Sequence, residues 1–588
     1  MAEAQTIIPI KEVKYNPIES TVDLSSPRQL KVAFPILLDG DLVMSTEHLG
    51  VGYLVSILRN AGAECKVFEV PGNCKFDEKV SREIVEWDPD LIGFSLTTVT
   101  VSHATDFGST LKNLLKDDVY FLAGGPLATF LGQELLLNPN WYFLDGLVRG
   151  EGDISMIRFA EAFWTDRDYS NVPSLSFKDS GGSIINNPIG AGVAELDMLP
   201  EPGRDQFEIN NGQQAYLRLA TTRGCTARCT FCNAPHADNK INPGKLWRAR
   251  SAENIVTEIE RLYHKYKFNT FDFVDSTFED PGSPRAKQRI GKLAEMIIEK
   301  DLNIYYNCCM QARNWTDKDK DLIKLLFNSG LEKVLIGIES GSKTGLALWK
   351  KKSTVEDNKR AISLLREAGI YVAFGFISYH PWSTFTEIRE NNEFLRDYMG
   401  HNLRRFTTKL EVYPGAEVLI RMRNEGLLHE DFDLTLNPLA YRFEDERIAK
   451  LSKATGLLYG ERYSEDMVIE EEPAVFEFET YDIVLHTFLS RILRHHRSNP
   501  DCVEIMNEGL VRVDAIKAEI CEYNFQLMTD LTDRAEKGVL SEEYVREARP
   551  KLDDYYIKQM RRLRDIQLSI SMKLHRANIS IRDIQFVK

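Results

Sequence analysis

Short apolar segments of strand length alternate with amphipathic segments of helix length through most of this chain, in two separate series. The first series predicts strands at 30–35, 66–70, 91–95 and 119–123, and its last strand–helix unit ends near Gly150. Strands that alternate with helices pair in parallel, because each crossover carries the chain back along the sheet. The sequence therefore predicts a doubly wound, Rossmann-like α/β sheet over residues 29–165. Ligands of such sheets bind beyond the carboxyl ends of the strands.

The second series starts near Tyr216 and contains six strand–helix units. Ser251 is placed to cap the first long helix, and Thr354 and Asp357 have the spacing of a capping box at a later one. Six units predict a (β/α)6 partial TIM barrel over residues 215–428, with the active site at the carboxyl ends of its strands. The strands are expected at 216–220, 270–274, 302–308, 333–338, 370–377 and 406–412.

Three segments lie outside these series. Residues 1–28 lack periodicity and are expected to form a leader arm, and residues 166–214, rich in Gly, Pro, Ser and Asn, are interpreted as a linker. Beyond residue 428 we expect a mostly helical C-terminal domain, 429–588, whose last helix is interrupted at Pro550. We expect the helices of this domain to roof the pocket of the barrel. They are predicted around 482–494, 504–531 and 542–573.

Composition limits the class of protein. At 588 residues, with 43% apolar and 27% charged residues, the chain is of ordinary globular type and too long for one core. No stretch approaches the ~18 continuous apolar residues that span a bilayer, and the first residues lack the layout of a signal peptide. We therefore expect a cytoplasmic protein without a membrane partner. The net charge of −15 does not suit a protein that binds nucleic acid through its phosphates.

Three of the nine cysteines, Cys225, Cys229 and Cys232, fall within eight residues with the spacing C-x3-C-x2-C. Three thiolates on one loop can hold three irons of a [4Fe–4S] cluster and leave the fourth iron open to a chelating substrate. These cysteines are therefore predicted as ligands of a reactive cluster. The alternative is a zinc site with His236 as the fourth ligand, although zinc sites more often contain paired C-x2-C modules. The remaining cysteines are expected to pack as structural thiols.

This loop follows the first strand of its series and resembles the cluster loop of the radical S-adenosylmethionine (SAM) superfamily. Phe231, just before the third cysteine, matches that family's aromatic position beside the adenine of SAM. The second strand ends in Asp-Ser-Thr-Phe at 275–278, which resembles an acidic motif that helps to hold the SAM amino group. The resemblance thus implies that Asp275 and Ser276 contribute to SAM binding.

Two later segments extend this resemblance. Residues 337–342 (Gly-Ile-Glu-Ser-Gly-Ser) end the fourth strand and match the family's strongest secondary signature. The resemblance implies that Glu339 and Ser340 contact the ribose and carboxylate of SAM. Residues 411–416 resemble a Tyr-Pro-Gly-Thr turn that closes the barrel in one branch of the family. With the front domain, the resemblance covers about residues 30–430.

The first sheet resembles the cobalamin-binding domain that precedes the barrel in one large branch of this family. The resemblance implies cobalamin contacts at turns after three successive strands. One departure is that the D-x-H-x-x-G motif, whose histidine binds cobalt, is absent: alignment on Gly50 places Ser45 and Glu47 at the Asp and His positions, with His48 one residue out of register. The alternative is a Rossmann-like scaffold without a cofactor. The implied contacts are Ser95, Leu96, Thr97, Gly124, Gly125 and Gly150.

The resemblance implies a cobalamin-dependent radical SAM enzyme, in which a 5′-deoxyadenosyl radical abstracts hydrogen from an unactivated carbon. The expected reaction is C-methylation of a small metabolite. The alternative is a cyclase, rearrangement or oxidation enzyme of the same architecture without net methyl transfer. Methylthiotransferases share the layout, but Cys65 and Cys74 fit their extra cluster cysteines badly. A purely structural or redox-sensing cluster would leave residues 337–342 without a role.

The expected cofactors are the [4Fe–4S] cluster, SAM and cobalamin, and the expected protein partner is an electron donor such as flavodoxin or ferredoxin. The sequence assigns no catalytic residue and does not identify the substrate.

Overall fold

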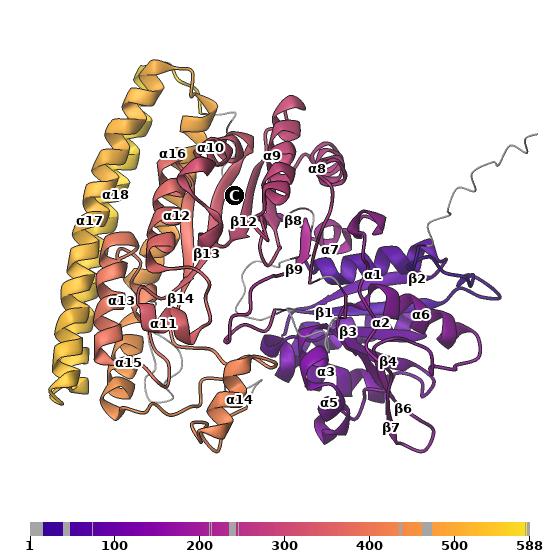
Figure 1. Ribbon diagram of the computed structural model, residues 1–588. Helices are drawn as coiled ribbons and strands as arrows, with labels where there is room; N and C mark the ends of the chain where they lie inside the picture. Colours follow the sequence, from indigo (N-terminus) through magenta and orange to yellow (C-terminus); the bar gives the residue numbers. More distant parts are fainter. Residues whose placement is uncertain are drawn as a thin grey trace, which may run out of the picture. The chain divides into compact units, whose positions relative to one another are not determined.

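The computed structural model describes residues 16–38, 47–72, 74–210, 212, 214–234, 243–244, 246–433, 438–460, 473–581 and 584 (Figure 1). The chain divides into two compact units, which are described separately. The first comprises Met1–Leu42, His48–Glu208 and Asn239–Lys245, and the second comprises Val43–Glu47, Ile209–Asp238 and Leu246–Lys588. None of the described helices has the length and apolar character that crossing a membrane requires.

The first unit is built on a seven-stranded sheet in the order β2-β1-β3-β4-β5-β6-β7. Its first five strands are parallel, and helices cover both faces, so the doubly wound prediction is confirmed. Alternate residues of one strand enter different cores: Val32, Phe34 and Ile36 pack with α1 and α6, whereas Ala33 packs on the other face with α2 and α3. The strands are β1 (Lys31–Leu37), β2 (Glu64–Val70), β3 (Leu91–Ser95), β4 (Tyr120–Gly124) and β5 (Gly146–Val148). The helices are α1 (Leu49–Asn60), α2 (Cys74–Trp87), α3 (Val101–Leu114), α4 (Gly125–Leu131), α5 (Gln133–Leu137) and α6 (Gly152–Trp164).

Part of the predicted linker belongs to this sheet. The strands β6 (Leu175–Lys178) and β7 (Ile184–Asn186) add to it as an antiparallel hairpin, so the linker interpretation of residues 166–214 is wrong for this stretch. Two strands this short show no sustained alternation, and β7 is largely exposed. Pairing with β5 supplies the hydrogen bonds that the local sequence does not predict.

The described part of the predicted leader arm, residues 16–28, packs on the first unit. Ile18 and Leu24 are buried in its core. The Glu161 carboxylate on α6 accepts hydrogen bonds from the Thr21 backbone N–H at 2.6 Å and from the Ser20 hydroxyl at 3.0 Å. The arm prediction is therefore wrong for these residues, because two well-placed apolar side chains anchor a segment without any periodic pattern. Residues 1–15 lie outside the described part of the chain.

The second unit contains a parallel five-stranded sheet in the order β14-β13-β12-β11-β8. Strands that are neighbours along the chain are neighbours in the sheet, as in a barrel wall. The predicted Ser251 cap and the Thr354–Asp357 capping box are confirmed. The strands are β8 (Leu217–Leu219), β11 (Thr270–Phe273), β12 (Tyr305–Met310), β13 (Leu331–Glu339) and β14 (Tyr371–Phe376). The helices are α8 (Ala252–Tyr266), α9 (Pro284–Glu299), α10 (Lys320–Ser329), α11 (Lys343–Leu348), α12 (Val355–Glu367) and α13 (Phe385–Tyr398).

The sixth barrel strand, predicted at 406–412, is not formed. Residues Leu403–Phe406 form a short 3-10 helix. The segment that follows pairs with the residues beyond β14 only through an isolated parallel bridge between Tyr379 and Lys409. The segment then turns inward, and Leu410 and Val412 are buried in a core cluster with Trp349. The apolar run that predicts a strand is therefore used for packing, so that the described wall of the partial barrel has five strands.

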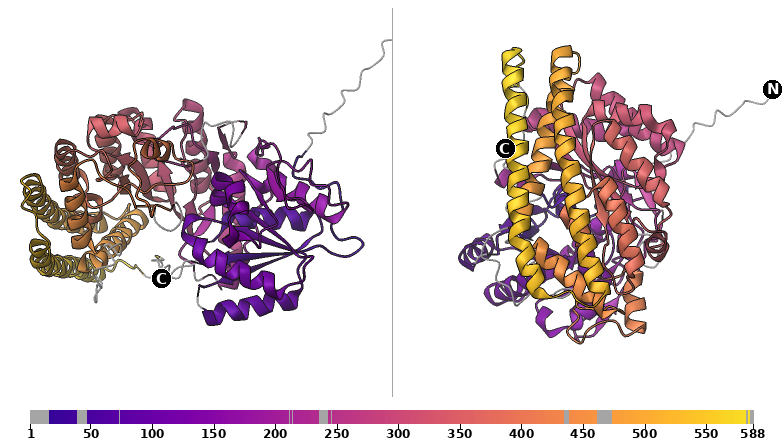
Figure 2. Two further views of the ribbon diagram at one scale, coloured as in Figure 1. Left: turned by 90° about the horizontal axis from the view of Figure 1, so that it is seen from below. Right: turned by 90° about the vertical axis from the view of Figure 1, so that its left-hand side faces the viewer.

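Five further helices complete the second unit: α14 (Glu417–Asn424), α15 (Glu446–Tyr459), α16 (Ala474–His495), α17 (Pro500–Glu536) and α18 (Glu542–Arg576). Figure 2 shows α17 and α18 as two long helices side by side. The predicted interruption at Pro550 is wrong, because α18 runs through it. A proline inside a helix costs about 3 kcal/mol, and the long apolar face of α18, buried from Val545 to Leu574, outweighs that cost.

The helix α16 does not take the roofing position that was expected of the C-terminal helices. Instead, α16 packs against the amino ends of β12, β13 and β14. Arg491 forms a buried ion pair with Glu332 near the start of β13, at 2.6 and 2.8 Å. The hydroxyl of Tyr371, the first residue of β14, donates to Asp482 at 3.2 Å. The prediction is wrong for α16, because an amphipathic pattern shows which face of a helix is buried but not which end of a sheet the helix covers.

Candidate functional site

The cysteine loop begins where β8 gives way to a short antiparallel pair, β9 (Thr222–Gly224) and β10 (Trp247–Ala249). Cys225, Cys229 and Cys232 are free, partly exposed thiols. The loop is tied down beside the third cysteine, because the Thr230 N–H donates to the Trp349 carbonyl at 3.2 Å and the Val418 N–H donates to the Thr230 carbonyl at 2.9 Å. The fold thus holds the three cysteines on an anchored loop at the carboxyl end of β8.

The surroundings of these three thiols, without a bound metal, favour the protonated form. Burial raises the pKa of Cys225 and Cys232, and it raises the pKa of Cys229 to about 11. Backbone N–H groups oppose this effect: Ala227 donates to the Cys225 sulfur and Ala234 to the Cys232 sulfur, both at 3.4 Å. Bound iron would supply positive charge, and N–H···S hydrogen bonds are an established way of stabilising cluster thiolates. The donor set therefore fits a [4Fe–4S] cluster.

Within the described ranges, no three His, Cys, Asp or Glu side chains converge as the ligands of one metal ion do. A [4Fe–4S] cube bonds each cysteine to a different iron, so its three thiolates need not meet at one point. His236, the fourth ligand of the zinc alternative, lies outside the described residues.

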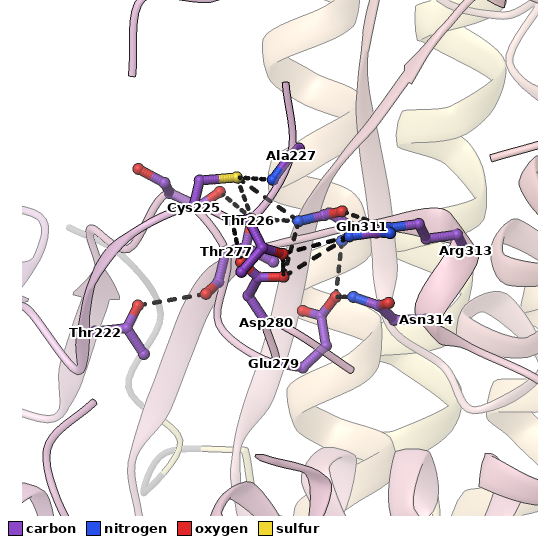
Figure 3. Close-up of polar contacts among 11 residues, drawn as sticks. Thr222, Cys225, Thr226, Ala227, Thr277, Glu279, Asp280, Gln311, Arg313 and Asn314 are labelled. Atoms are coloured by element: carbon purple, nitrogen blue, oxygen red, sulfur yellow. Dashed lines mark hydrogen bonds and ion pairs between the residues drawn. The ribbon is translucent and has the colours of Figure 1, made fainter. Parts of the chain in front are cut away.

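A polar network braces the loop beside Cys225 (Figure 3). The Asp280 carboxylate accepts the Thr226 N–H and the Thr226 hydroxyl, both at 2.6 Å, and it is fully buried. The Gln311 amide, just beyond β12, donates to Asp280 and to the Thr277 hydroxyl at 3.3 Å and approaches the Cys225 sulfur at 3.7 Å. Sequence reasoning missed Asp280 and Gln311. Gln311 directly follows β12 and Asp280 lies in the loop after β11, so a position beyond the carboxyl end of a barrel strand was the available signal.

Glu279 adds an unusual carboxyl to this network. One of its oxygens accepts the Gln311 N–H at 2.9 Å and the Asn314 amide at 2.8 Å, and the other has no hydrogen-bond partner. Complete burial raises the pKa of Glu279 to about 7, because the loss of hydration outweighs the hydrogen bonds from Asn314 and Gln311, which lower it.

Asp275, predicted to hold the SAM amino group, is buried and engaged with the chain itself. Its carboxylate accepts the N–H groups of Thr221 and Thr222 at 2.7 and 2.8 Å, and also the Thr221 hydroxyl. Burial raises its pKa. These bonds fasten the segment that leads into the cysteine loop. Ser276, the next residue, is exposed. The structure thus gives Asp275 a positioning role, and direct contact of either residue with SAM stays a prediction.

Glu339, at the end of β13, lies beside the loop in a left-handed backbone conformation, with φ of 66°. Its carboxylate lies 3.5 Å from the Lys351 ammonium group, and both side chains are about nine-tenths buried. Gly337 makes room for this carboxylate, since a Cβ there would come within 2.8 Å of it. Lys351, which the sequence reasoning missed, lowers the pKa of Cys229 against the larger effect of burial. An ion pair thus stands beside the second cysteine.

The other two predicted SAM contacts, Phe231 and Ser340, differ in how deeply they are buried. Phe231 is partly buried, and its ring packs edge-on against Trp349, with 5.7 Å between centroids. Ser340 is fully buried, and its hydroxyl donates to Asn391 at 2.9 Å and accepts the Ser342 N–H at 3.0 Å. The structure therefore uses Ser340 to shape the turn after β13. Contacts of these residues with SAM stay predictions.

The six predicted cobalamin contacts lie together at the carboxyl edge of the first sheet. Ser95 and Gly124 are paired neighbours at the ends of β3 and β4, and Gly150 follows β5. Gly125 has φ of 92°, and a Cβ there would approach the Leu96 carbonyl to 2.8 Å. By contrast, a Cβ on Gly124 would meet nothing within 4 Å. This edge therefore offers backbone and small side chains to a bulky ligand. Thr97 lies at the same edge, partly exposed, whereas the Leu96 side chain is buried.

The residues around the missing cobalt-binding motif have structural roles. Glu47, aligned with the usual histidine, is buried in the second unit, where its carboxylate accepts the Arg218 N–H at 3.1 Å. The His48 ring caps α1 by accepting the Val51 N–H at 3.3 Å. Ser45 lies outside the described residues.

Comparison with known proteins identifies both domains. Residues 219–395 match the model of the radical SAM superfamily, and residues 40–159 match that of the B12 binding domain. These domains imply a [4Fe–4S] cluster, SAM and cobalamin as cofactors. The chain is 25% identical over 411 residues to an uncharacterized methyltransferase of Pyrococcus horikoshii, covering 68% of this chain and 85% of that protein.

Two further similarities complete the comparison. The anaerobic magnesium-protoporphyrin IX monomethyl ester cyclase of Rubrivivax gelatinosus is 26% identical over 361 residues, which are 59% of this chain and 61% of the cyclase. The solved structure of the cobalamin-dependent SAM radical enzyme OxsB shares the fold over 91% of this chain and 84% of its own, with a TM-score of 0.64 and 18% identity. The chain therefore belongs to the radical SAM superfamily, in the branch in which a B12-binding domain precedes the radical SAM domain.

Proposed function

We propose that this protein is a cobalamin-dependent C-methyltransferase that acts on a poorly activated carbon of a small metabolite. The observation that carries the proposal is the pairing, in one chain, of a B12-binding domain with a radical SAM domain. The similarity to a protein named as a methyltransferase, over 68% of this chain, supports it. When bound, the cluster and SAM supply hydrogen abstraction from carbon, and cobalamin supplies a carrier for the methyl group.

The chain's own residues hold and orient these groups. Cys225, Cys229 and Cys232 bind iron, and the Asp280–Thr226 contact keeps their loop in one conformation. The ion pair of Lys351 and Glu339 places compensating charges beside Cys229 without exposing either side chain. In the first unit, a Cβ on Gly124 would meet nothing within 4 Å, which leaves the sheet edge at this position accessible to a ligand.

A second candidate is a cyclase, rearrangement or oxidation enzyme of the same architecture. The similarity to the Rubrivivax cyclase, at 26% identity, favours it. Such an enzyme cleaves SAM but passes on no methyl group.

The products of SAM distinguish the two candidates. The reconstituted, cobalamin-loaded protein is incubated anaerobically with SAM, a reductant and a fractionated metabolite extract. The methyltransferase uses SAM twice per turnover, so S-adenosylhomocysteine and 5′-deoxyadenosine accumulate together in about equal amounts. Methyl-deuterated SAM then marks the product. Production of 5′-deoxyadenosine alone, dependent on one fraction, would support the second candidate. The C225A/C229A/C232A variant is the control and produces no 5′-deoxyadenosine.

A further inference from the structure

Positive charge gathers around the cysteine loop in a chain whose net charge is −15. A small cavity beside the loop is lined by Ala227 and Cys229, by Arg313 from beyond β12, and by Lys351 and Lys352 from beyond α11. Arg228 lies between two of these residues in the loop and is exposed. We call Arg228, Arg313, Lys351 and Lys352 the basic rim.

The charges of the rim that face solvent are not neutralised. Arg228 and Lys352 are exposed, and neither pairs with an acid within the described part of the chain. The nearby carboxylates contribute little charge to the surface, since Asp280 is fully buried and the Glu339 side chain is 12% exposed. The rim therefore presents a net positive surface next to a proposed cluster ligand.

Lys350, the neighbour of the rim in sequence, is different. It is paired at 2.5 Å with Glu417, and both side chains are more than half exposed. Its charge is therefore compensated locally, and Lys350 is not counted in the basic rim.

A cluster that gains one electron in each turnover needs an external reductant, and electron transfer weakens steeply with distance. A protein donor must therefore dock where the cluster ligands come close to the surface. Electron-transfer complexes are small and short-lived, and complementary charge sets how fast they form. The basic rim meets both requirements, because it shares a cavity with Cys229 and carries unpaired positive charge.

We propose that the basic rim is the docking surface for an acidic one-electron carrier protein that contains a flavin or an iron–sulfur centre. One electron passes from the reduced carrier, which is oxidised by one electron, to the cluster, which is reduced by one electron. No covalent bond forms or breaks between the two proteins, and the transfer needs no proton. This inference rests on the proposed function only in requiring a cluster on Cys225, Cys229 and Cys232.

Stopped-flow reduction of the reconstituted full-length protein tests the docking surface. The probe is a photoreduced flavodoxin of strongly negative net charge, and bleaching of the cluster absorbance gives the second-order rate constant. We expect R228E/K352E to lower this rate constant at least tenfold at low salt, because the charges of the rim act on association. The rate constant of this variant should also depend much less on salt concentration than that of the wild type. The single variant K352E changes a residue outside the cysteine loop, and we expect it to slow the reduction of the cluster several-fold.

Two controls distinguish impaired docking of the carrier from loss of the cluster or of the fold. R546E/K558E makes the same charge change at exposed positions on α18 and is expected to leave the rate constant within twofold. Reduction by photoreduced 5-deazaflavin, a neutral small molecule, is expected to be equally fast in all variants, and each is expected to retain about four irons.

Equal rates with flavodoxin for the wild type, R228E/K352E and R546E/K558E would overturn the docking surface. A wild type that binds no iron would overturn the cluster assignment as well. Neither assay needs SAM, cobalamin or substrate, so a failure of methyl transfer leaves this result unaffected.

Discussion

Asp280 lies fully buried just beyond β11, and its two oxygens accept both hydrogen-bond donors of Thr226. An asparagine at this position keeps the size of the side chain but replaces one acceptor with a donor. The Thr226 N–H or hydroxyl then loses its partner, which costs about 1–3 kcal/mol for a buried group. Because this contact lies between the first two cysteines, its loss acts on the cysteine loop.

We therefore expect D280N to fold but to lose its cluster several-fold faster than the wild type. The measurement is iron content over time after transfer to a chelator. D317N, at a position with a 78% exposed side chain, serves as the control and should match the wild type. Equal rates of iron loss in D280N and the wild type would contradict the positioning role of Asp280.

Glu279 is expected to make the free energy of unfolding depend on pH. Its pKa is raised to about 7 in the folded protein from the usual 4.5, so the folded state binds more protons than the unfolded state between these values. The free energy of unfolding should therefore fall as pH rises from 5 to 8, by about 3 kcal/mol from this residue. E279Q should flatten this part of the profile. Urea unfolding of the two proteins at a series of pH values measures the difference, and parallel profiles would refute the argument.

At the scale of elements, α16 is fastened to the amino ends of the barrel strands by a buried ion pair. Arg491 and Glu332 have side chains that are 1% and 5% exposed, and the guanidinium stacks on Tyr305 at 3.8 Å from the ring centroid. Removing one partner of a buried pair leaves an uncompensated charge, whereas replacing both with apolar residues is often tolerated.

R491M is therefore expected to lower the free energy of unfolding by about 3–5 kcal/mol, and R491M/E332L is expected to recover most of the loss. Urea unfolding followed by circular dichroism gives these values. The exposed pair of Lys453 and Glu542 provides the comparison, since K453M should cost less than about 1 kcal/mol. A double variant as unstable as R491M would show that the pair matters through packing and not through charge.

At the scale of the whole molecule, the two cofactor-binding domains belong to separate compact units. A leucine at Gly124 should leave the fold intact, because the backbone there is extended and a Cβ meets nothing within 4 Å. The added side chain should occupy the space predicted for cobalamin. We expect G124L to weaken cobalamin binding at least tenfold while the iron content stays at about four per chain.

Equilibrium binding of hydroxocobalamin, with iron analysis of the same samples, measures both effects. S183L adds the same side chain in the β6–β7 turn, at the opposite edge of the sheet, and should bind cobalamin like the wild type. Loss of iron in G124L would show that the two sites depend on each other, and unchanged cobalamin binding would place the ligand elsewhere.

Local sequence determined the features whose physical cause is local. The cysteine spacing places three thiols on one loop, the strand–helix alternation produces the two parallel sheets, and the capping residues at Ser251 and Thr354 begin their helices. Each depends on residues a few positions apart, so that periodicity and spacing suffice to predict it.

Tertiary structure decided everything that depends on distant partners. Asp280 holds Thr226, which lies 54 residues away, and Lys351 reaches Cys229 from beyond α11. The β6–β7 hairpin forms because β5 offers an edge, and the segment at 406–412 packs inward where a sixth strand was expected. The physical reason is the same in each case: burial and hydrogen bonding compete with local preference, and their strength depends on which neighbours the completed fold supplies.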